Sequence, residues 1–208
     1  MRRLRDCGLT LVLTALFLVA LAATGISGWL AENARLLEHG QPPLGLSAYL
    51  LTGGFASAVM ENWESEFLQM GVYVVLTAFL FQRGSAESKD PDAPPLPPLP
   101  PVRDPVARLG RFLKCYSLGI VLFGLFLATF AGHLAASAAA RADDAAMHGQ
   151  GAAPGARIGD AEFWFESFQN WQSEFLSTAV LVVLSIFLRF RGSPESKPVE
   201  AGNLETGT

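Results

Sequence analysis

Long runs of apolar residues, separated by polar segments, dominate the chain. The runs cover residues 9–30, 55–81, 116–136 and 163–190. A helix needs about 20 residues to cross the hydrocarbon core of a bilayer, and the first and third runs reach that length with apolar residues alone. The second and fourth runs reach it only with the polar and aromatic residues that precede their apolar cores. The pattern predicts an all-α integral membrane protein with four transmembrane helices.

The second and fourth runs are copies of one sequence. Residues 62–89 and 170–197 align without a gap at an offset of 108, and 18 of the 28 aligned pairs are identical. Upstream the offset becomes 109, where His39-Gly40-Gln41 matches His148-Gly149-Gln150. Such a repeat decides how the fold is interpreted. We predict two tandem helical hairpins, residues 1–89 and 108–197, with transmembrane helices at about 9–30, 55–81, 116–136 and 163–190.

The segments outside the helices have biased compositions. Residues 90–107 are rich in proline and predict an extended, semi-rigid linker, with a proline-rich ligand for a partner domain as the less favoured alternative. Residues 138–156 are rich in Ala and Gly and predict a mobile loop. Residues 198–208 have few apolar side chains and predict a disordered tail.

Residues 9–30 also match a cleavable signal peptide. Three arginines precede the run, at Arg2, Arg3 and Arg5, and Ala20-Leu21-Ala22 resembles a cleavage site. The counterpart of this run in the second hairpin lies in the middle of the chain, where no signal peptide can be. The repeat therefore favours retention of the first helix.

Basic residues predict the orientation in the membrane. Twelve of the 15 Lys and Arg residues lie before the first run, between the second and third, or after the fourth. Because Lys and Arg near helix ends mark the cytoplasmic side, we expect both termini and the linker to be cytoplasmic, in a bacterial inner membrane. Each hairpin has an even number of spans. The two hairpins therefore point the same way, related by a pseudo-twofold axis along the membrane normal.

Composition narrows the classes of function. Half of the residues are hydrophobic and 16% are charged, too few to cover the core of a soluble fold. No basic stripe with interleaved aromatics indicates nucleic acid as a partner. Cys7 and Cys115 stand apart, without the spacing of a metal or redox site. No catalytic motif is present. We therefore predict a non-enzymatic protein with no cofactor and no bound metal.

A repeated polar element precedes the apolar cores of the second and fourth runs. From Glu66 to Arg83, and from Glu174 to Arg191, is about 25 Å of helix. With the arginines at the cytoplasmic interface, both glutamates lie near the outer end of the apolar slab, where carboxylates are candidates for function. The candidate binding residues are Asn62, Trp63, Ser65 and Glu66 in the first copy, Asn170, Trp171, Ser173 and Glu174 in the second, and His133 near the outer end of the third run.

Two interpretations of these residues stay open. Asn and Glu four residues apart share a helix face, so the pseudo-twofold could form a polar ring that binds protons, cations or a small polar solute in a channel or transporter. The favoured interpretation is structural packing, because Trp suits the membrane interface and Ser and Asn hydrogen-bond across helices. His133 is interpreted as an interface residue, or as a proton-linked partner if Glu66 or Glu174 lies nearby.

Two motifs, Asn-Trp-x-Ser-Glu-Phe-Leu and Arg-Gly-Ser-x-Glu-Ser-Lys, each occur twice at matching spacing. In this the chain resembles a bacterial family of membrane proteins described as a domain of unknown function. The resemblance covers nearly the whole chain and departs from the family in the second outer loop, which is rich in Ala and Gly. It implies a membrane protein and supplies no activity, cofactor or substrate.

Partners other than the lipid bilayer are suggested by two further patterns. Gly124, Ala128, Gly132 and Ala136 form a small-residue stripe, which predicts a helix contact seam or a homo-oligomer interface. The segments that begin at Gly84 and Gly192 and end at Lys89 and Lys197 predict glycine C-caps followed by polar turns near lipid headgroups. Docking of a cytoplasmic partner at those two segments is the alternative.

Overall fold

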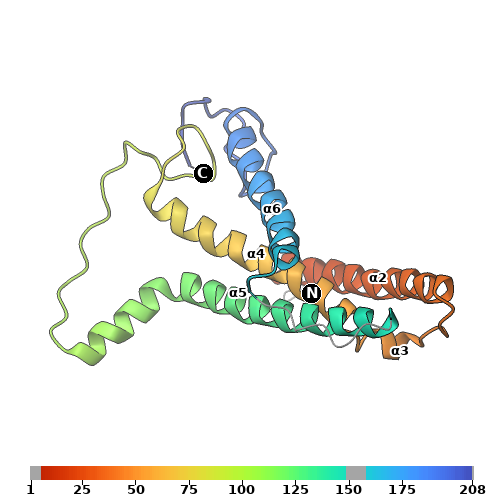
Figure 1. Ribbon diagram of the computed structural model, residues 1–208. Coiled ribbons are helices and arrows are strands. Elements are labelled where there is room, and N and C mark those ends of the chain that lie inside the picture. Colours follow the sequence, from red (N-terminus) through yellow and green to blue (C-terminus); the bar gives the residue numbers. More distant parts are fainter. Residues whose placement is uncertain (1–5, 149–157, 208) are drawn as a thin grey trace. The chain divides into compact units, whose positions relative to one another are not determined.

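The computed structural model describes residues 6–148 and 158–207. The described residues form helices and connecting segments, with no strand among them, which confirms the all-helical prediction. The helices are α2 (Gly8–Glu38), α3 (Leu46–Tyr49), α4 (Gly53–Phe79), α5 (Pro105–Met147) and α6 (Ala161–Phe187) (Figure 1). Of the sequence-based predictions, those on Arg2, Arg3 and Arg5 and on Gly149 and Gln150 fall outside the described residues.

Two of these helices are long and apolar enough to cross a membrane. They are α2, with a mean hydropathy of 2.4 in its most apolar window, and α5, with 2.0. Only 6% and 11% of those windows are buried, so neither helix is the core helix of a soluble protein. Apolar side chains left facing water are unfavourable, whereas a helix surrounded by hydrocarbon satisfies its backbone internally. This combination favours membrane association.

Helix α5 is longer than the predicted 116–136 span at both ends. At its start, the Asp104 carboxylate accepts a hydrogen bond from the Ala107 N–H at 2.7 Å, and Pro105 fits the first position, where its missing N–H is not needed. At its other end the helix continues to Met147, because alanine has the highest helix propensity. The mobile loop predicted from residue 138 is therefore wrong as far as Met147.

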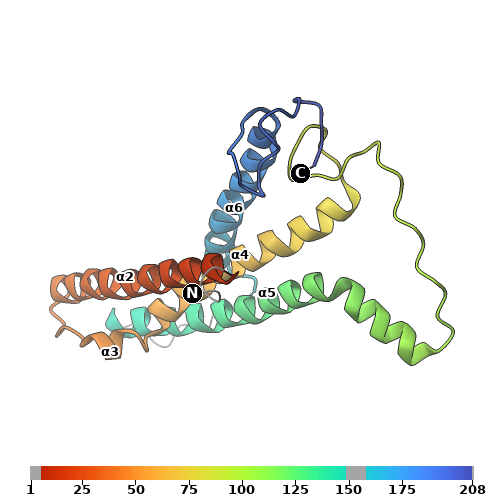
Figure 2. The same cartoon turned by 180° about the vertical axis from the view of Figure 1, so that it is seen from behind.

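The chain divides into two compact units, Met1–Val59 with His133–Arg157 and Met60–Gly132 with Ile158–Thr208. In the first unit, α2 and the last part of α5 lie side by side (Figures 1 and 2). Arg35 pairs with Asp144 at 2.7 Å. The rings of His39 and His148 meet edge to face, 5.5 Å apart. In both pairs the two residues occupy positions 109 apart, which is the repeat offset of this region.

The connection after α2 folds back on that helix. The Trp29 indole N–H and the Asn33 side-chain amide both donate to the Leu44 carbonyl oxygen, at 2.7 and 3.0 Å. Gly53 then begins α4 against α5: a Cβ at this position would lie 2.5 Å from the Ala140 nitrogen. Only glycine permits this approach of the two backbones.

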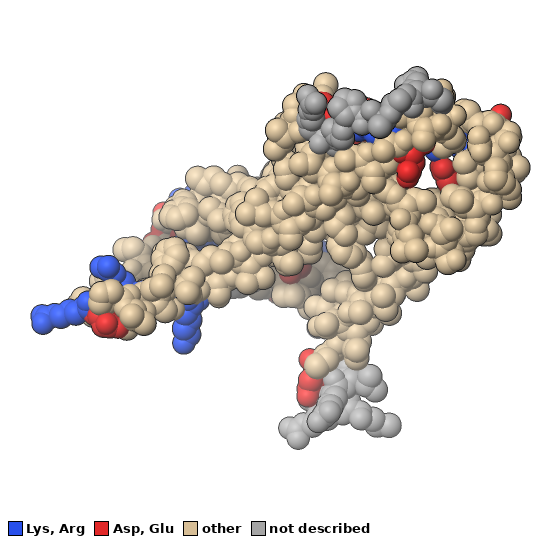
Figure 3. All heavy atoms as spheres, turned by 60° about the horizontal axis from the view of Figure 1, so that its bottom comes forward, with Lys and Arg blue, Asp and Glu red and all other residues tan. Residues whose placement is uncertain are grey.

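In the second unit, α6 packs against α5 and against α4 from Met60 onward. Phe163, fully buried, meets Phe130 at 5.4 Å, and Trp171 meets Phe126 at 6.1 Å. α4 and α6 lie close in the first part of α6 and diverge toward their C-terminal ends (Figures 1 and 2). Lys and Arg gather where α5 begins (Figure 3). Of the small-residue stripe, Gly132 lies against Met60, whereas Gly124 has nothing near its Cβ position.

Candidate functional site

Side chains of the repeated polar element join α4 to α6. The Asn170 side-chain amide donates to Glu61, and the Trp171 indole N–H donates to Glu64 Oε1 at 2.9 Å. Further along both helices, the Gln69 side-chain amide donates to the Thr178 hydroxyl. These are contacts between helices through polar groups with good hydrogen-bonding capacity. The element therefore contributes helix packing within this unit.

The predicted glutamates lie apart from this hydrogen-bonded contact. Glu66 is exposed and Glu174 is half-buried. The two carboxylates are close enough to repel each other electrostatically. The polar ring that the sequence suggested around Glu66 and Glu174 stays a prediction.

The two predicted serines form hydrogen bonds within their own helices. The hydroxyls of Ser65 and Ser173 donate to the carbonyl oxygens of Asn62 and Asn170, three residues back, each at 2.8 Å. Serine bonded in this way satisfies its hydroxyl within one helix. These bonds occupy the hydroxyl protons that a polar ring would have offered to a ligand.

The two tryptophans and His133 have different surroundings. Trp171 belongs to an aromatic cluster and meets Phe168 edge to face at 5.3 Å, while Trp63 is half-buried. His133 lies in the first unit with its side chain fully buried. Its pairing with Glu66 or Glu174 stays a prediction.

Glu64 is the carboxylate that sequence reasoning missed. Its side chain is fully buried, whereas Glu66 two residues later is exposed. One signal was available: the second copy has Gln172 at this position in an otherwise matching Asn-Trp-x-Ser-Glu-Phe-Leu motif. A repeat that changes a carboxylate to an amide at one position indicates that the two copies meet different neighbours there.

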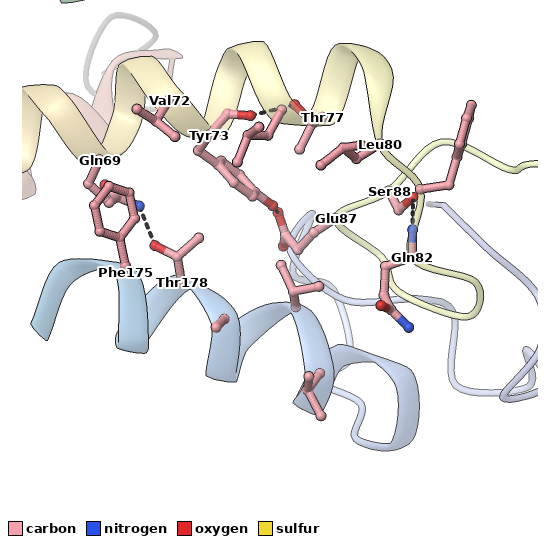
Figure 4. A pocket seen from close by; sticks show the side chains of 15 residues that line it. Gln69, Val72, Tyr73, Thr77, Leu80, Gln82, Glu87, Ser88, Phe175 and Thr178 are labelled. Atoms are coloured by element: carbon pink, nitrogen blue, oxygen red, sulfur yellow. Dashed lines mark hydrogen bonds between the residues drawn. The ribbon is translucent and has the colours of Figure 1, made fainter. Parts of the chain in front are cut away.

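A pocket lies between α4 and α6 where the helices diverge (Figure 4). Its volume is about 390 Å³. Gln69 and Thr178 bound the pocket at one end, Gln82 and Ser88 bound it at the other, and between them the Tyr73 hydroxyl donates to Glu87 Oε2 at 2.8 Å (Figure 4). Its other lining residues are mostly apolar. None of the nine predicted site residues lines this pocket.

Glu87 lies in the first of two matching turns, residues 82–89 and 190–197. Gly84 and Gly192 have φ angles of +86° and +87°, which glycine adopts readily. They stand five residues beyond the ends of α4 and α6, so they are turn residues rather than the predicted helix C-caps. The serine side chains bond alike: the Gln82 N–H donates to Ser88 Oγ, and the Phe190 N–H to Ser196 Oγ, both at 2.8 Å.

The two turns bring a pair of carboxyl groups together. Glu87 and Glu195 occupy equivalent positions in the repeated motif, and their carboxyl groups are close enough to interact electrostatically. Burial is the main cause that raises the pKa of Glu87, and the nearby Glu195 carboxyl raises it further, while the hydrogen bond from the Tyr73 hydroxyl acts in the opposite direction. Two carboxyl groups held near each other each disfavour the ionised form of the other.

The C-terminal tail, residues 198–207, is held in place by Lys197. The Lys197 ammonium is almost fully buried and donates to the carbonyl oxygens of Gly202, Asn203 and Glu205, at 3.0, 3.2 and 2.8 Å. The tail also reaches the first turn, where the Gly207 N–H donates to the Ser85 carbonyl at 3.0 Å. The predicted disordered tail is thus corrected: an ammonium with three carbonyl partners compensates for the tail's few apolar side chains.

The fold and these contacts define an all-helical protein with two helices that could cross a membrane and with polar contacts between α4 and α6. The chain belongs to the family described as Domain of unknown function (DUF6766), whose model matches residues 1–208. Neither curated proteins nor solved structures gave a match to the chain.

Proposed function

We propose that the protein is a non-enzymatic, multi-pass membrane protein of four spans, whose repeated Asn-Trp-x-Ser-Glu element holds α4 and α6 together. The observation that carries the proposal is the pair of hydrogen bonds from Asn170 to Glu61 and from Trp171 to Glu64, which use the element for packing. Lipid tails are as apolar as the side chains of the helices, so the hydrophobic effect does not drive helices together within a bilayer. Hydrogen bonds between helices therefore contribute to their association.

Two further observations support four spans in two hairpins of the same direction. α4 and α6 have 27 residues each, or about 40 Å of helix, which suffices for a bilayer. Near-equivalent residues of the two copies touch: Arg35 with Asp144, His39 with His148, and Gln69 with Thr178 are each 109 apart. Contact between equivalent residues is expected close to a twofold axis.

The orientation follows from the basic residues around the linker and after α6. Both termini and the linker are cytoplasmic in this proposal, in a bacterial inner membrane. Reporter fusions test it: alkaline phosphatase fused at Leu99 should be inactive and a fluorescent reporter there should be bright. An active phosphatase at Leu99 contradicts the topology, and a fusion at Gly45 provides the opposite control.

A second candidate function is conduction or transport of protons, cations or a small polar solute through Glu66 and Glu174. The electrostatic repulsion between these two carboxylates favours this candidate, because a bound cation would reduce that repulsion. The double variant Glu66→Gln with Glu174→Gln separates the candidates. Transport predicts a folded, inserted protein that loses a proton or cation flux measured in vesicles. Packing predicts no flux from the unsubstituted protein.

A further inference from the structure

The pocket between α4 and α6 has the size of a ligand site. Its volume of about 390 Å³ falls in the range of roughly 300–1,000 Å³ that small-molecule sites occupy. Both walls come from one unit of the structure: Val72 and Leu76 of α4 face Phe175, Val182 and Val183 of α6. Such walls would accept an apolar body.

A carboxyl group lies between the two ends of the pocket (Figure 4). Glu87 is half-buried and uses Oε2 to accept the hydrogen bond from Tyr73, while Oε1 is buried and has no hydrogen-bond donor within the described residues. The Glu195 carboxyl approaches the same group. A buried acceptor of this kind is unfavourable until a donor reaches it.

The nearby cations are engaged elsewhere. The Lys89 ammonium donates to the Ala78 carbonyl at 2.6 Å, and the Arg83 guanidinium pairs with Asp92 at 2.6 Å. No Lys, Arg or His is among the residues that line the pocket. The apolar walls thus flank a carboxylate that has no cationic side chain beside it among the residues lining the pocket.

We propose that this pocket binds a hydrophobic cation, an ammonium group on an apolar body, with Glu87 as its counterion and Tyr73 holding that carboxylate in place. The apolar body lies between Leu76 of α4 and Val182 of α6. Apolar walls with one placed polar group are the usual composition of a small-molecule site. A neutral molecule of the same shape leaves Glu87 without a partner, and an anion is repelled.

Binding is measured on the full chain in non-ionic maltoside micelles by isothermal titration calorimetry. The probe is benzylammonium, whose amine stays protonated between pH 4.5 and 7, and its neutral isostere is ethylbenzene. We expect saturable binding of the cation, with the isostere about tenfold weaker or more, because the ammonium–carboxylate interaction is lost. Equal affinity of the two molecules overturns the proposal.

Two variants and one control locate the site. Glu87→Gln removes the charge at constant size and should weaken binding of the probe about tenfold. Ala179→Phe fills the pocket and should abolish binding, and Glu200→Gln, a carboxylate outside the pocket, should change nothing. Unchanged binding in Glu87→Gln, or in a folded Ala179→Phe, contradicts the proposal, as does equal weakening in Glu200→Gln. These outcomes are independent of the packing role of the Asn-Trp-x-Ser-Glu element.

Protonation gives a second readout. The titratable groups that act on Glu87 are Tyr73 from α4 and Glu195 from the second turn. Because the pKa of Glu87 lies above its ordinary 4.5, binding should weaken as pH falls from 7 toward 4.5. In Glu87→Gln this dependence should disappear, and its persistence counts against Glu87.

The ammonium could come from a free amine or from a phosphatidylethanolamine headgroup. Adding that lipid to the micelles separates the two sources. Competition with the probe identifies a lipid headgroup, and undiminished probe binding identifies a free hydrophobic amine.

Discussion

The two copies of the repeated sequence form the same turn but meet different neighbours. Gly84 and Gly192 share one backbone conformation, yet a Cβ at Gly84 would collide with the Asn203 carbonyl oxygen, whereas a Cβ at Gly192 meets nothing within 4 Å. Likewise Glu64 is buried against Trp171, and its counterpart Gln172 is exposed. The difference shows that duplication copies local structure, while each copy's role depends on what packs against it.

The largest contrast is expected between Glu64 and Gln172. Glu64→Ala leaves the Trp171 indole N–H without its acceptor in a buried contact, which should lower the free energy of unfolding by about 2–3 kcal/mol. Gln172→Ala, on an exposed side chain, should change it by less than about 0.5 kcal/mol. Thermal unfolding in detergent measures both. Equal effects of the two substitutions would show that the copies are equivalent here.

Substitution of the two turn glycines separates backbone strain from the contact with the tail. Gly192→Ala should destabilise by about 1 kcal/mol, the strain of a positive φ. Gly84→Ala carries the same strain and must also displace Asn203 of the tail, so we expect about 2 kcal/mol in all. Chemical denaturation followed by Trp fluorescence gives both values. A Gly192 effect as large as that of Gly84 contradicts the role of the tail.

The two lysines of the turns should differ in how they protect the tail. Lys197→Met removes the donor to three tail carbonyls, so a Glu-specific protease should cut at Glu200 and Glu205 about tenfold faster, as local opening becomes easier. Lys89 donates to a single carbonyl, that of Ala78, and Lys89→Met should leave the cleavage rate unchanged. Faster cleavage in both variants would point to general loosening of the unit.

The smallest effect concerns Glu87 and its counterpart Glu195. The pKa of Glu87 is raised in the folded protein, so its contribution to stability is fully present below its ordinary pKa and is lost as pH rises through the raised value. Glu87→Gln should remove this decline, with a change under about 1 kcal/mol because the side chain is only half-buried. Glu195 is exposed, so Glu195→Gln should remove a smaller part of this pH-dependent decline in stability. Melting temperatures from pH 4 to pH 8 test this ordering.

Glu64 and Glu66 show which part of the candidate site could be predicted from the sequence. Spacing predicted Glu66 near the outer end of the second run, where the cost of a carboxylate in hydrocarbon made it a candidate, and Glu64 was not considered. Residues two apart on a helix point in different directions, and which one is buried depends on how α4 is turned against α6. Periodicity did not reveal that rotation, because the region before the apolar core has aromatic and polar residues on several faces.

The sequence by itself determined the helices, the doubled motif and the two matching turns. Each depends on interactions within a few residues: backbone hydrogen bonds, alanine propensity, a positive φ at glycine, and serine bonds to neighbouring N–H groups. The tertiary structure alone decided that Glu64 is buried, that Lys197 holds the tail, and that Tyr73 and Glu87 bound a pocket. Trp171 and Glu64 are 107 residues apart, while Lys197 and Tyr73 meet partners 5 to 14 residues away across segments that follow no regular repeat. In each case the energy arises only when packing brings the partners together.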